Sequence, residues 1–462
     1  MKKITLLLAI LFFKTFASNA QCYSSIEAGT DFNIAIKTDG TLWGWGKNDN
    51  GQLGDGTFVN KNTPTKIGTE NDWQTISVGD NHTLAVKTNG TLWGWGNNAF
   101  SKIGFVSSGQ VTSPTQVGIA TNWAIISAGS NHSMAIKFDG TLWGWGRNFE
   151  GQLGNGGSPT VISSPTQIGT ATNWSEVATG LNHSIATRSG NTLWGWGQAG
   201  EVGDGSNIQR NLPVQIGTGT NWAQPFANTS SMATKTDGTL WAWGNNGNGQ
   251  LGIGSTANQL NPVQVGTATN WRNVSMGFGH TLAVNASNTL YGWGRNANGQ
   301  LGDGTTVNKL SPIIISQNIL KMAAGSEQNI ATLTNTLVYT WGSNQYGQIG
   351  TGTTSTTGQP VAPTSINCPT SLANSEFEID NYSVYPNPVN DIMTINNKNL
   401  FSENTTITIF DITGKLIQSK FLNDVDNKSS IEIEIQSNIE KGLYFLQIKQ
   451  DNIIQTIKFI KN

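Results

Sequence analysis

The residues of this chain best suited to chemistry are its four histidines, His82, His132, His183 and His280. Each stands three residues after a glycine, at the same place in a repeated pattern. The histidines could ligate a metal ion together, or each could begin a strand and bond backbone groups. The three or four ligands of a metal site converge at about 2 Å, whereas equivalent positions in a wide ring lie far apart. We therefore favour structural histidines and expect neither a metal nor a cofactor.

Other catalytic arrangements find no support in the sequence. A Ser–His–Asp triad has no candidate, because every histidine belongs to the repeats. The repeated acids Asp39, Asp139 and Asp237 precede glycine in predicted hairpin turns. The glycine-rich loops lack the Gly-Lys-Ser/Thr ending of a phosphate-binding loop. We expect no catalytic residues and a protein that is not an enzyme.

The stretch Asp139–Gly146, of sequence DGTLWGWG, shows how the chain positions these residues. Its Asp-Gly pair predicts a hairpin turn, and side chains alternate between faces in the strand that follows. Trp143 and Trp145 then point to one face, and the two glycines of the strand point to the other. Such a sheet can stack on a copy of itself, with its tryptophans against the glycines of its neighbour.

This tryptophan motif recurs along the chain. Its first aromatic residues stand 47 to 51 positions apart and define seven units. The motif tryptophans are Trp43, Trp45, Trp93, Trp95, Trp143, Trp145, Trp194, Trp196, Trp241, Trp243, Trp293 and Trp341. Each unit has four short β segments, and a period near 50 residues is typical of propeller blades. All 17 tryptophans fall at repeat positions, so we assign them a structural role.

Composition limits the class of protein and of partner. Charged residues make up 12% of the chain, and no long segment has a 3.6-residue apolar period, so we expect an all-β protein. Residues 21–370 contain 16 acids and 15 Lys or Arg, without a basic cluster. This balance argues against a nucleic-acid partner.

The chain starts like an exported protein. Lys2 and Lys3 precede a short apolar run, and small residues at Ser18 and Ala20 suit signal cleavage. No other segment is apolar enough to anchor the mature chain in a membrane.

The two cysteines, Cys22 and Cys368, flank the seven units. Ring closure would bring them together, and we expect a disulfide between them, because export places both thiols where oxidation is possible. The alternative is two unpaired cysteines. We also expect the final strand, 361–366, to pair with the first unit and close the ring.

The repeat resembles that of a known family. In the third unit, Gly-x-x-His-Ser-x-Ala is followed by Asp-Gly-x-Leu-Trp-x-Trp-Gly-x-Asn and then Gly-Gln-Leu-Gly. This pattern is similar to the repeat of the regulator-of-chromosome-condensation family and covers about three quarters of the chain. The resemblance implies a seven-bladed β-propeller. That family includes a nucleotide exchange factor for a nuclear GTPase, whose activity we do not transfer, and a secreted inhibitor of β-lactamases.

The last part of the chain resembles a second family. Alternating apolar segments predict a small β-sandwich there. Four strings resemble the C-terminal sorting domain of type IX secretion, at 384–391, 410–415, 441–445 and 458–461. The resemblance implies transport across the outer membrane of a Bacteroidetes-like bacterium. The predicted parts are a signal peptide (1–20), a propeller (21–369), a linker (370–380) and a sorting sandwich (381–462).

The loops after the tryptophan strands differ from unit to unit. Their distinctive aromatic and cationic residues are Lys47, Phe58, Phe100, Phe105, Arg147, Phe149, Arg210, Arg295 and Tyr346. Loops on a rigid scaffold suit recognition, although ordinary loop packing explains these residues equally well. The sequence favours an exported, monomeric module that binds a protein or glycan. The alternative is a secreted polysaccharide-degrading enzyme that uses the central cleft.

Overall fold

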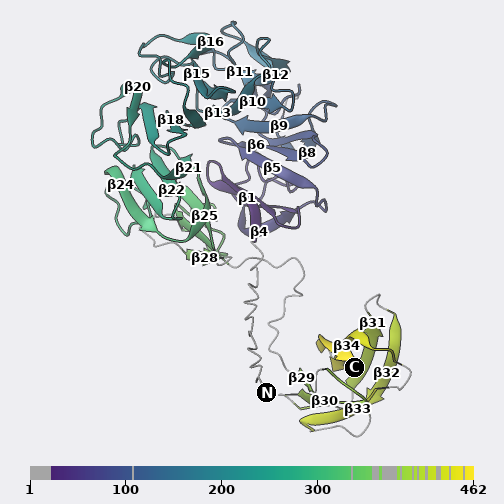
Figure 1. The fold of residues 1–462 in the computed structure, drawn as a ribbon. Helices are drawn as coiled ribbons and strands as arrows, with labels where there is room; N and C mark the ends of the chain where they lie inside the picture. Colours follow the sequence, from purple (N-terminus) through teal and green to yellow (C-terminus); the bar gives the residue numbers. More distant parts are fainter. Residues whose placement is uncertain are drawn as a thin grey trace, which may run out of the picture. The chain divides into compact units, whose positions relative to one another are not determined.

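The repeated units fold into seven antiparallel sheets of four strands each, numbered here as blades 1 to 7 in chain order. Figure 1 shows these blades arranged in a ring in the computed structural model. The structure describes residues 22–106, 109–334, 337–355, 364–366, 382–385, 388–397, 400–402, 405–411, 415–422, 428–435, 439–450 and 453–461. The predicted all-β fold with a seven-bladed propeller is confirmed.

Within each blade the strands follow one another in sequence order, from a first strand at the centre of the ring to a fourth at its rim. The first strands are β1 (Tyr23–Ala28), β5 (Trp73–Val78), β9 (Trp123–Ala128), β13 (Trp174–Thr179), β17 (Trp222–Ala227), β21 (Trp271–Met276) and β25 (Ile319–Ala324). The second strands are β2 (Phe32–Lys37), β6 (His82–Lys87), β10 (His132–Lys137), β14 (His183–Arg188), β18 (Ser230–Lys235), β22 (His280–Asn285) and β26 (Gln328–Leu333).

The third and fourth strands complete each blade. The third strands, which carry the tryptophan motif, are β3 (Leu42–Gly46), β7 (Leu92–Gly96), β11 (Leu142–Arg147), β15 (Thr192–Gly197), β19 (Leu240–Gly244), β23 (Leu290–Gly294) and β27 (Val338–Gly342). The fourth strands are β4 (Lys61–Ile67), β8 (Val111–Gln116), β12 (Val161–Gln167), β16 (Arg210–Gln215), β20 (Gln259–Gln264), β24 (Lys309–Ser316) and β28 (Thr364–Ile366). A single 3-10 turn, η1 (Ala99–Ser101), follows β7 in the described part of the chain.

The paired tryptophans lie on one face of their sheet, as predicted. Trp143 and Trp145 both pack edge-on against Trp123 of the same blade, with ring centroids 5.8 and 6.2 Å apart. This arrangement recurs in blades 2, 4 and 5, where the leading residue is again a tryptophan. The aromatic face of a blade packs against the aliphatic face of the preceding one, as where Trp123 and Trp145 share a buried cluster with Leu84 of blade 2.

The second tryptophan of each pair joins two blades. Trp145 donates its indole N–H to the carbonyl oxygen of Lys102 in blade 2, at 2.8 Å. It also lies against Gly104, whose added Cβ would come within 3.1 Å of the indole nitrogen. The predicted contact of a tryptophan with a glycine of the neighbouring blade is present. The prediction that this glycine lies in the tryptophan strand is wrong. This glycine belongs to the loop between the third and fourth strands, because the strand glycine Gly144 faces Met134 of its own blade.

Blade 7 closes on blade 1 without exchanging a strand. β28 pairs with β27, so every sheet of the propeller is built from four consecutive strands. The prediction that the final strand pairs with the first unit is therefore wrong. Side-chain bonds hold the seam instead: Trp45 Nε1 and Asn33 Nδ2 both donate to the carbonyl oxygen of Gln348, at 3.1 and 2.7 Å. The same pair of bonds recurs at each blade interface, so the ring needs no special closing strand.

Some sequence predictions lie outside the described residues, namely the signal peptide, the linker and Cys368. Cys22 is buried in the seam between blades 1 and 7, and the described part of the chain has no free cysteine. The disulfide stays a prediction. Among the described residues, no helix is long and apolar enough to cross a membrane.

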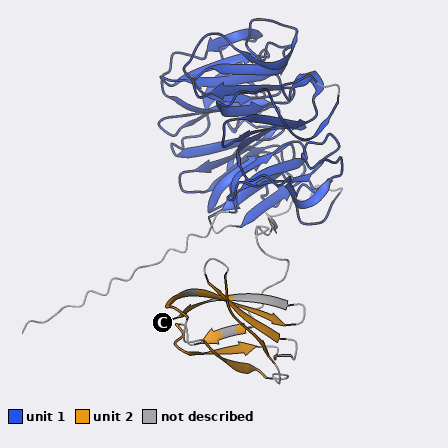
Figure 2. Ribbon diagram, turned by 90° about the vertical axis from the view of Figure 1, so that its right-hand side faces the viewer, with its two compact units in different colours: residues 1–371 blue, residues 372–462 orange. Residues whose placement is uncertain are grey.

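Residues 372–462 form a second compact unit, drawn in orange in Figure 2. One of its sheets contains β29 (Tyr382–Tyr385), β30 (Ile392–Asn397) and β33 (Ser430–Glu434). The other contains β32 (Leu416–Leu422), β31 (Thr405–Asp411), β34 (Gly442–Gln450) and β35 (Ile453–Lys461). Apolar side chains of both sheets, such as Ile395 and Leu446, meet in one buried cluster. The predicted small β-sandwich is confirmed.

Candidate functional site

The histidines begin the second strands and reach the next blade. His132 is fully buried, and its Nε2 lies 2.9 Å from Ser184 Oγ of blade 4. Ser184 Oγ itself donates to the carbonyl oxygen of Gln152 at 2.9 Å. The imidazole Nε2 must therefore carry the proton and donate it to the serine oxygen. The equivalent bonds join His82 to Ser133, His183 to Ser231 and His280 to Asn329.

The histidines are uncharged at neutral pH. Burial lowers the pKa of His132 to about 3, with a further lowering by His183 and Arg147. The same cause lowers the pKa of His183 and of His280 to about 4. These imidazoles bond the side chains of neighbouring blades, whereas the sequence had suggested bonds to backbone groups. Among the described residues, no three His, Cys, Asp or Glu side chains gather closely enough to hold a metal ion.

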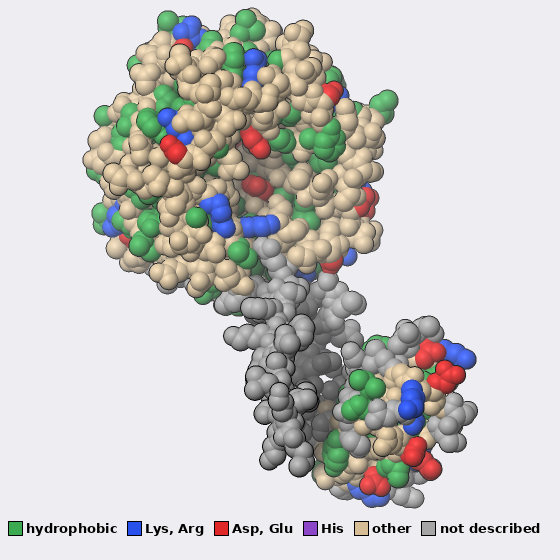
Figure 3. Space-filling view, viewed as in Figure 1, with side chains coloured by type: hydrophobic (Ala, Val, Ile, Leu, Met, Phe, Trp, Pro, Cys, Tyr) green, Lys and Arg blue, Asp and Glu red, His purple; other side chains and the backbone are tan. Residues whose placement is uncertain are grey.

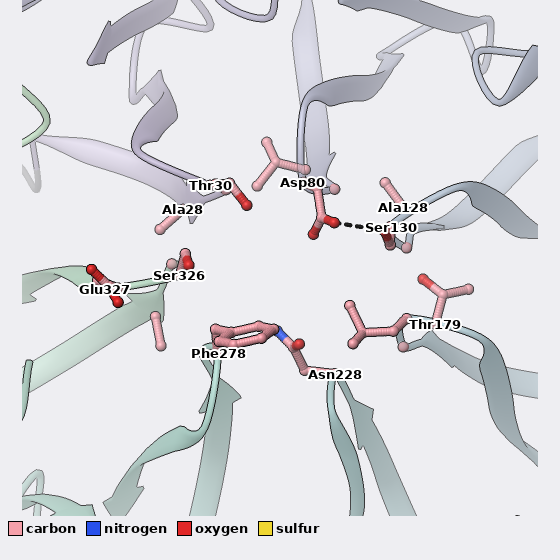
Figure 4. A pocket seen from close by; sticks show the side chains of 18 of the residues that line it. Ala28, Thr30, Asp80, Ala128, Ser130, Thr179, Asn228, Phe278, Ser326 and Glu327 are labelled. Carbon is pink, nitrogen blue, oxygen red and sulfur yellow. Dashed lines mark hydrogen bonds between the residues drawn. The ribbon is translucent and has the colours of Figure 1, made fainter. Parts of the chain in front are cut away.

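The turns between the first and second strands surround a cavity of about 350 Å³ at the centre of the ring (Figure 4). Glycines form much of its wall, and each is packed too closely to carry a side chain. A Cβ on Gly79 would lie 2.1 Å from the carbonyl oxygen of Gly129 in the next blade. The residue after each of these glycines therefore contributes a side chain to the cavity wall. These residues are Thr30, Asp80, Ser130, Leu181, Phe278 and Ser326.

The charged groups of the cavity are already engaged with partners. Asp80 Oδ2 accepts a 2.5 Å bond from Ser130 Oγ. Glu327 pairs with Arg295 at 2.8 Å and accepts a 2.6 Å bond from an asparagine of the adjoining loop. Figure 4 shows Asp80 and Glu327 at separate places on the cavity wall, with Ala28 and Thr30 between them. The arrangement offers hydroxyl, carboxylate and guanidinium groups around a small space, and the described residues place no pair of unbonded acids in it.

The loops after the third strands lie on the same face as this cavity. The backbone N–H of Lys47 donates to the carbonyl oxygen of Asp31 at 2.8 Å, and Arg295 N–H donates to Gly279 at 2.7 Å. Bonds of this kind tie the variable loop to a cavity turn in every blade except blade 5, so we call this side of the propeller the loop face. Figure 3 shows one face of the propeller, hollowed at its centre, with acidic side chains at the hollow.

The repeats match a known family. The regulator of chromosome condensation (RCC1) repeat matches residues 39–86, 89–136, 139–187, 237–284, 287–332 and 337–377. A second form of the same repeat matches residues 23–52, 73–101, 123–152 and 271–300. These matches cover more than half of the chain. The chain belongs to the RCC1 repeat family.

Solved structures share the fold of this RCC1-repeat propeller at low sequence identity. Human WBSCR16 has a TM-score of 0.60 at 22% identity, covering 67% of this chain and 86% of that one. Prp20p from Saccharomyces cerevisiae, described with its binding to Gsp1p and histones, has a TM-score of 0.59 at 21% identity, covering 66% and 81%. Yeast RCC1 (Prp20) bound by Kap60 has a TM-score of 0.62 at 19% identity, covering 83% and 93%. At these identities the likeness shows the fold alone.

The second unit also matches a family. Residues 383–462 match the secretion system C-terminal sorting domain. This domain marks a protein that is exported by type IX secretion and then attached to the cell surface or released, so the predicted export route is confirmed. A curated relative, the ulvan lyase NLR42 of Nonlabens ulvanivorans, is 32% identical over 94 residues, 20% of this chain and 16% of that protein. The chain thus spans about a sixth of that relative's length, and the matched stretch is far shorter than the RCC1-repeat propeller.

Three predicted loop residues of the propeller form one group, called here the aromatic cluster: Phe100, Arg147 and Phe149. The two phenylalanine rings meet edge-on, with centroids 5.8 Å apart, and are 39% and 41% exposed. The Arg147 guanidinium lies 4.8 Å from the Phe149 ring centre and pairs with Glu150 at 2.6 Å. Phenylalanine and arginine are among the residue types enriched in the cores of protein interfaces.

The other predicted loop residues are spread around the ring. Lys47 lies over the ring of Tyr346, 4.9 Å from its centre, across the seam between blades 1 and 7. Arg210 pairs with an aspartate of its own loop at 2.6 Å. Phe58 is exposed by itself, and Phe105 packs against the core of its blade. Only part of the predicted set is therefore brought together in the described structure.

Sequence reasoning missed a buried cation beside the cavity. Lys102 Nζ donates to Asn81 Oδ1 at 2.6 Å, to the Ser130 carbonyl at 3.0 Å and to Asn131 Oδ1 at 3.2 Å. Burial lowers the pKa of Lys102 to about 8, although the negative charge of Asp80 acts in the opposite direction. The sequence signal that could have revealed this residue is a departure from the repeat, because five other units have glutamine at the position of Lys102.

The same substitution reshapes the loop before it. In blade 3, Gln152 Oε1 accepts a bond from the Glu150 backbone N–H at 3.0 Å. A lysine cannot accept such a bond. In blade 2, Ser101 keeps the positive φ of the repeat glycine (55°, against 73° at Gly151), whereas Phe100 instead adopts a positive φ of 60°. This conformation is uncommon for non-glycine residues and costly for a bulky side chain. One of the exposed aromatic rings is thus held in a strained backbone.

Proposed function

We propose that the propeller is an exported binding module whose loop face recognises a protein or a glycan outside the cell. The observation that carries this proposal is the shared face: the exposed aromatic cluster and the central cavity lie on the same side of one rigid ring. Binding residues concentrate on loops that a rigid scaffold positions. The strain at Phe100 supports the same conclusion, because strained residues gather at functional sites.

The relatives support a binding role without naming the partner. Prp20p is described with its binding to Gsp1p and histones, and yeast RCC1 has been solved bound to Kap60. Those partners belong to those proteins, and the sorting domain sends this chain out of the cell. We infer that this chain uses the same scaffold for a partner it meets at the cell surface or in the surrounding medium.

Affinity capture tests the proposal. The purified propeller would be immobilised and exposed to surface extracts and growth polysaccharides of the producing cell. We expect a retained protein or glycan whose affinity falls at least about 10-fold in Phe149→Ala, because this change removes an exposed aromatic ring of the loop face. Phe138→Ala is the matched control, since Phe138 is 71% exposed and follows β10 at its end remote from the loop face. Equal losses in both variants would contradict recognition by the loop face.

A second candidate function is degradation of a polysaccharide. The partial similarity to an ulvan lyase favours it, as does the presence of two acids, Asp80 and Glu327, in the cavity. Glycoside hydrolysis needs two available carboxyl groups, whereas both acids here are bonded to neighbours. Incubation of the whole protein with ulvan and other polysaccharides would decide between the two functions. New reducing ends or unsaturated products that disappear in Asp80→Asn would establish the enzyme.

A further inference from the structure

We propose that the central cavity is a subsite for one neutral sugar ring, which would make the ligand of the loop face a glycan. This inference rests on the proposed binding function and specifies its ligand class. The volume of about 350 Å³ is at the low end of the roughly 300–1,000 Å³ typical of small-molecule sites. A space of this size suits a single ring better than a peptide chain.

An aromatic platform breaks the symmetry of the cavity. Where the neighbouring blades 5 and 7 line the cavity with Asn228 and Ser326, blade 6 has Phe278, which is 48% exposed. Its backbone N–H donates to the Ser326 carbonyl at 3.2 Å, which fixes the residue at the cavity wall. Figure 4 shows its ring between Asn228 and Ser326. The negative face of an aromatic ring attracts polarised hydrogens, such as the C–H groups on one side of a pyranose.

A carboxylate faces this platform. Figure 4 shows the Asp80 carboxylate directed into the cavity from the side opposite Phe278. One of its oxygens accepts the bond from Ser130, and the other accepts no hydrogen bond from the described residues. The buried ammonium of Lys102 lies behind Ser130, whose carbonyl oxygen it bonds at 3.0 Å. A carboxylate oxygen that accepts no hydrogen bond from the described residues is available as an acceptor for a sugar hydroxyl.

The charges of the cavity favour a neutral sugar over an acidic one. Arg295 is the cationic residue of the cavity wall, and Glu327 already neutralises it at 2.8 Å. A uronic acid would bring its negative charge toward Asp80 without a free cation among the described wall residues to receive it. The hydroxyl groups of Thr30 and Ser326 also line the wall, where they can exchange hydrogen bonds with the uncharged hydroxyl groups of a sugar.

Ligand-observed NMR with the full-length protein tests this proposal. The probes are methyl glycosides of hexoses, deoxyhexoses and pentoses, with methyl glucuronide as the acidic comparison. We expect at least one neutral glycoside to bind, with affinity at least about 10-fold weaker in Phe278→Ala and in Asp80→Asn, because each variant removes one of the groups that contact the ring. Phe278→Trp should retain binding, which separates loss of the platform from loss of the fold. Phe138→Ala is the unaffected control.

Several outcomes would overturn the subsite. No binding by any neutral glycoside, tighter binding of the glucuronide, or binding that survives Phe278→Ala would each do so. A glycoside lost in Phe149→Ala but kept in Phe278→Ala would place recognition at the aromatic cluster and leave the proposed function intact. Capture of a protein partner without glycoside binding would also overturn the sugar subsite and leave the proposed binding function intact. Failure of both capture and glycoside binding would count against the proposed function itself.

Discussion

At the scale of single residues, the histidines donate hydrogen bonds from one blade to the next and do not serve as metal ligands. His132 donates to Ser184, and Ser184 donates onward to the carbonyl oxygen of Gln152. The same carbonyl oxygen accepts the indole N–H of Trp196 at 2.8 Å. One glutamine carbonyl therefore collects two bonds from the next blade, and the histidine orients one of the donors. Blade 7 replaces the histidine with Gln328, which bonds the carbonyl oxygen of Gly29 at 2.9 Å.

The first prediction concerns acid stability. The pKa of His132 in the folded protein, about 3, lies below its ordinary value near 6.5. Between these pH values the unfolded chain binds a proton that the folded protein does not, so stability is present above pH 6.5 and falls as pH decreases. The fall reaches about 1.4 kcal/mol per pH unit for this histidine. His132→Gln, which introduces the residue that blade 7 has at this position, should remove this part of the pH dependence.

Urea unfolding of the wild type and His132→Gln at several pH values between about 7 and 4 checks this prediction. The unfolding free energy of the variant is subtracted from that of the wild type at each pH. This subtraction removes the effect of Glu27 and Glu201, whose pKa burial raises to about 7 and which therefore add stability as the pH falls. An identical pH slope in the two proteins would show that His132 is protonated in the folded state.

Particular residues show what could be predicted from the sequence at this scale. The structural role of the tryptophans followed from their fixed period, and Arg147 and Phe149 were selected as loop residues because they vary between units, although their contact with each other was not predicted. The cavity residues Asp80 and Phe278 could not be found, because they occupy a repeat position whose side chains meet only when seven blades form a ring. Lys102 was visible as a departure from the repeat, but its burial depends on tertiary contacts with Asn81 and Ser130.

At the scale of elements, the loop glycines are as important as the strands. Gly154 has a φ of 74°, and an added Cβ would lie 2.9 Å from the Trp196 ring of the next blade and 3.2 Å from Pro213. Gly169 has a similar φ of 64°, but nothing lies within 4 Å of its added Cβ. Alanine substitutions at Gly154 and Gly169 therefore separate two contributions to the free energy of unfolding, the backbone conformation at both sites and the packing at Gly154 alone.

The second prediction compares Gly154→Ala with Gly169→Ala. Gly169→Ala should cost about 1–2 kcal/mol of unfolding free energy, which is the penalty of a left-handed conformation for a residue with a side chain. Gly154→Ala carries the same penalty and also displaces a buried tryptophan, so we expect it to cost at least about 1–3 kcal/mol more. Chemical denaturation of both variants measures the difference. Equal costs would mean that the contact between Trp196 and the loop is not tight.

The third prediction concerns the strained loop at η1. Phe100→Gly removes the positive-φ penalty of about 1–2 kcal/mol and loses an aromatic pair worth about 0.5–1.5 kcal/mol. The two effects nearly cancel, so the thermal midpoint should stay within a few degrees of the wild type. Binding to the captured partner should nevertheless weaken, because an exposed ring of the aromatic cluster is gone. A large loss of stability would show that Phe100 is retained for folding.

At the scale of the whole molecule, the repeat and the sorting domain have separate tasks. The alternation of buried and exposed residues made the strands of the sandwich predictable, as in β33, although β29 was not predicted because it is short and adjoins a proline-rich string. Ring closure was predicted with the wrong strand. The sequence of the seventh unit contains four strand segments of its own, and the Trp45 and Asn33 bonds to Gln348 make strand exchange unnecessary.

The fourth prediction is that export depends on residues 383–462. The sorting domain is recognised by the type IX system, whereas the propeller closes its own ring and contributes no strand to the sheets described in the second unit. Truncation before residue 383 should therefore leave a folded propeller in the periplasm. Cell fractionation and immunoblotting measure its location, and a fusion of residues 372–462 to a reporter protein is the matched control. Normal surface delivery of the truncated propeller would contradict this division of tasks.

The fifth prediction is the disulfide between Cys22 and Cys368. Cys22 is buried with Tyr23 and Trp45 of blade 1 and with Ile330 of blade 7, so it lies at the seam where the ring closes. A bond from there to Cys368 would close a loop across 346 positions (368 − 22) and join the two ends of the propeller. Chain entropy for such a loop gives an upper value of about 5–6 kcal/mol, which native strain and residual unfolded structure reduce.

A mutant cycle measures this contribution. Cys22→Ser, Cys368→Ser and the double variant should be destabilised by similar amounts, because each removes the same bond. Reducing agent should lower the stability of the wild type to that of the variants and leave the variants unchanged. Thiol labelling of the denatured, non-reduced wild type should find no free cysteine. Two labelled cysteines would show that the repeated side-chain bonds at the seam hold the ring closed without a covalent link.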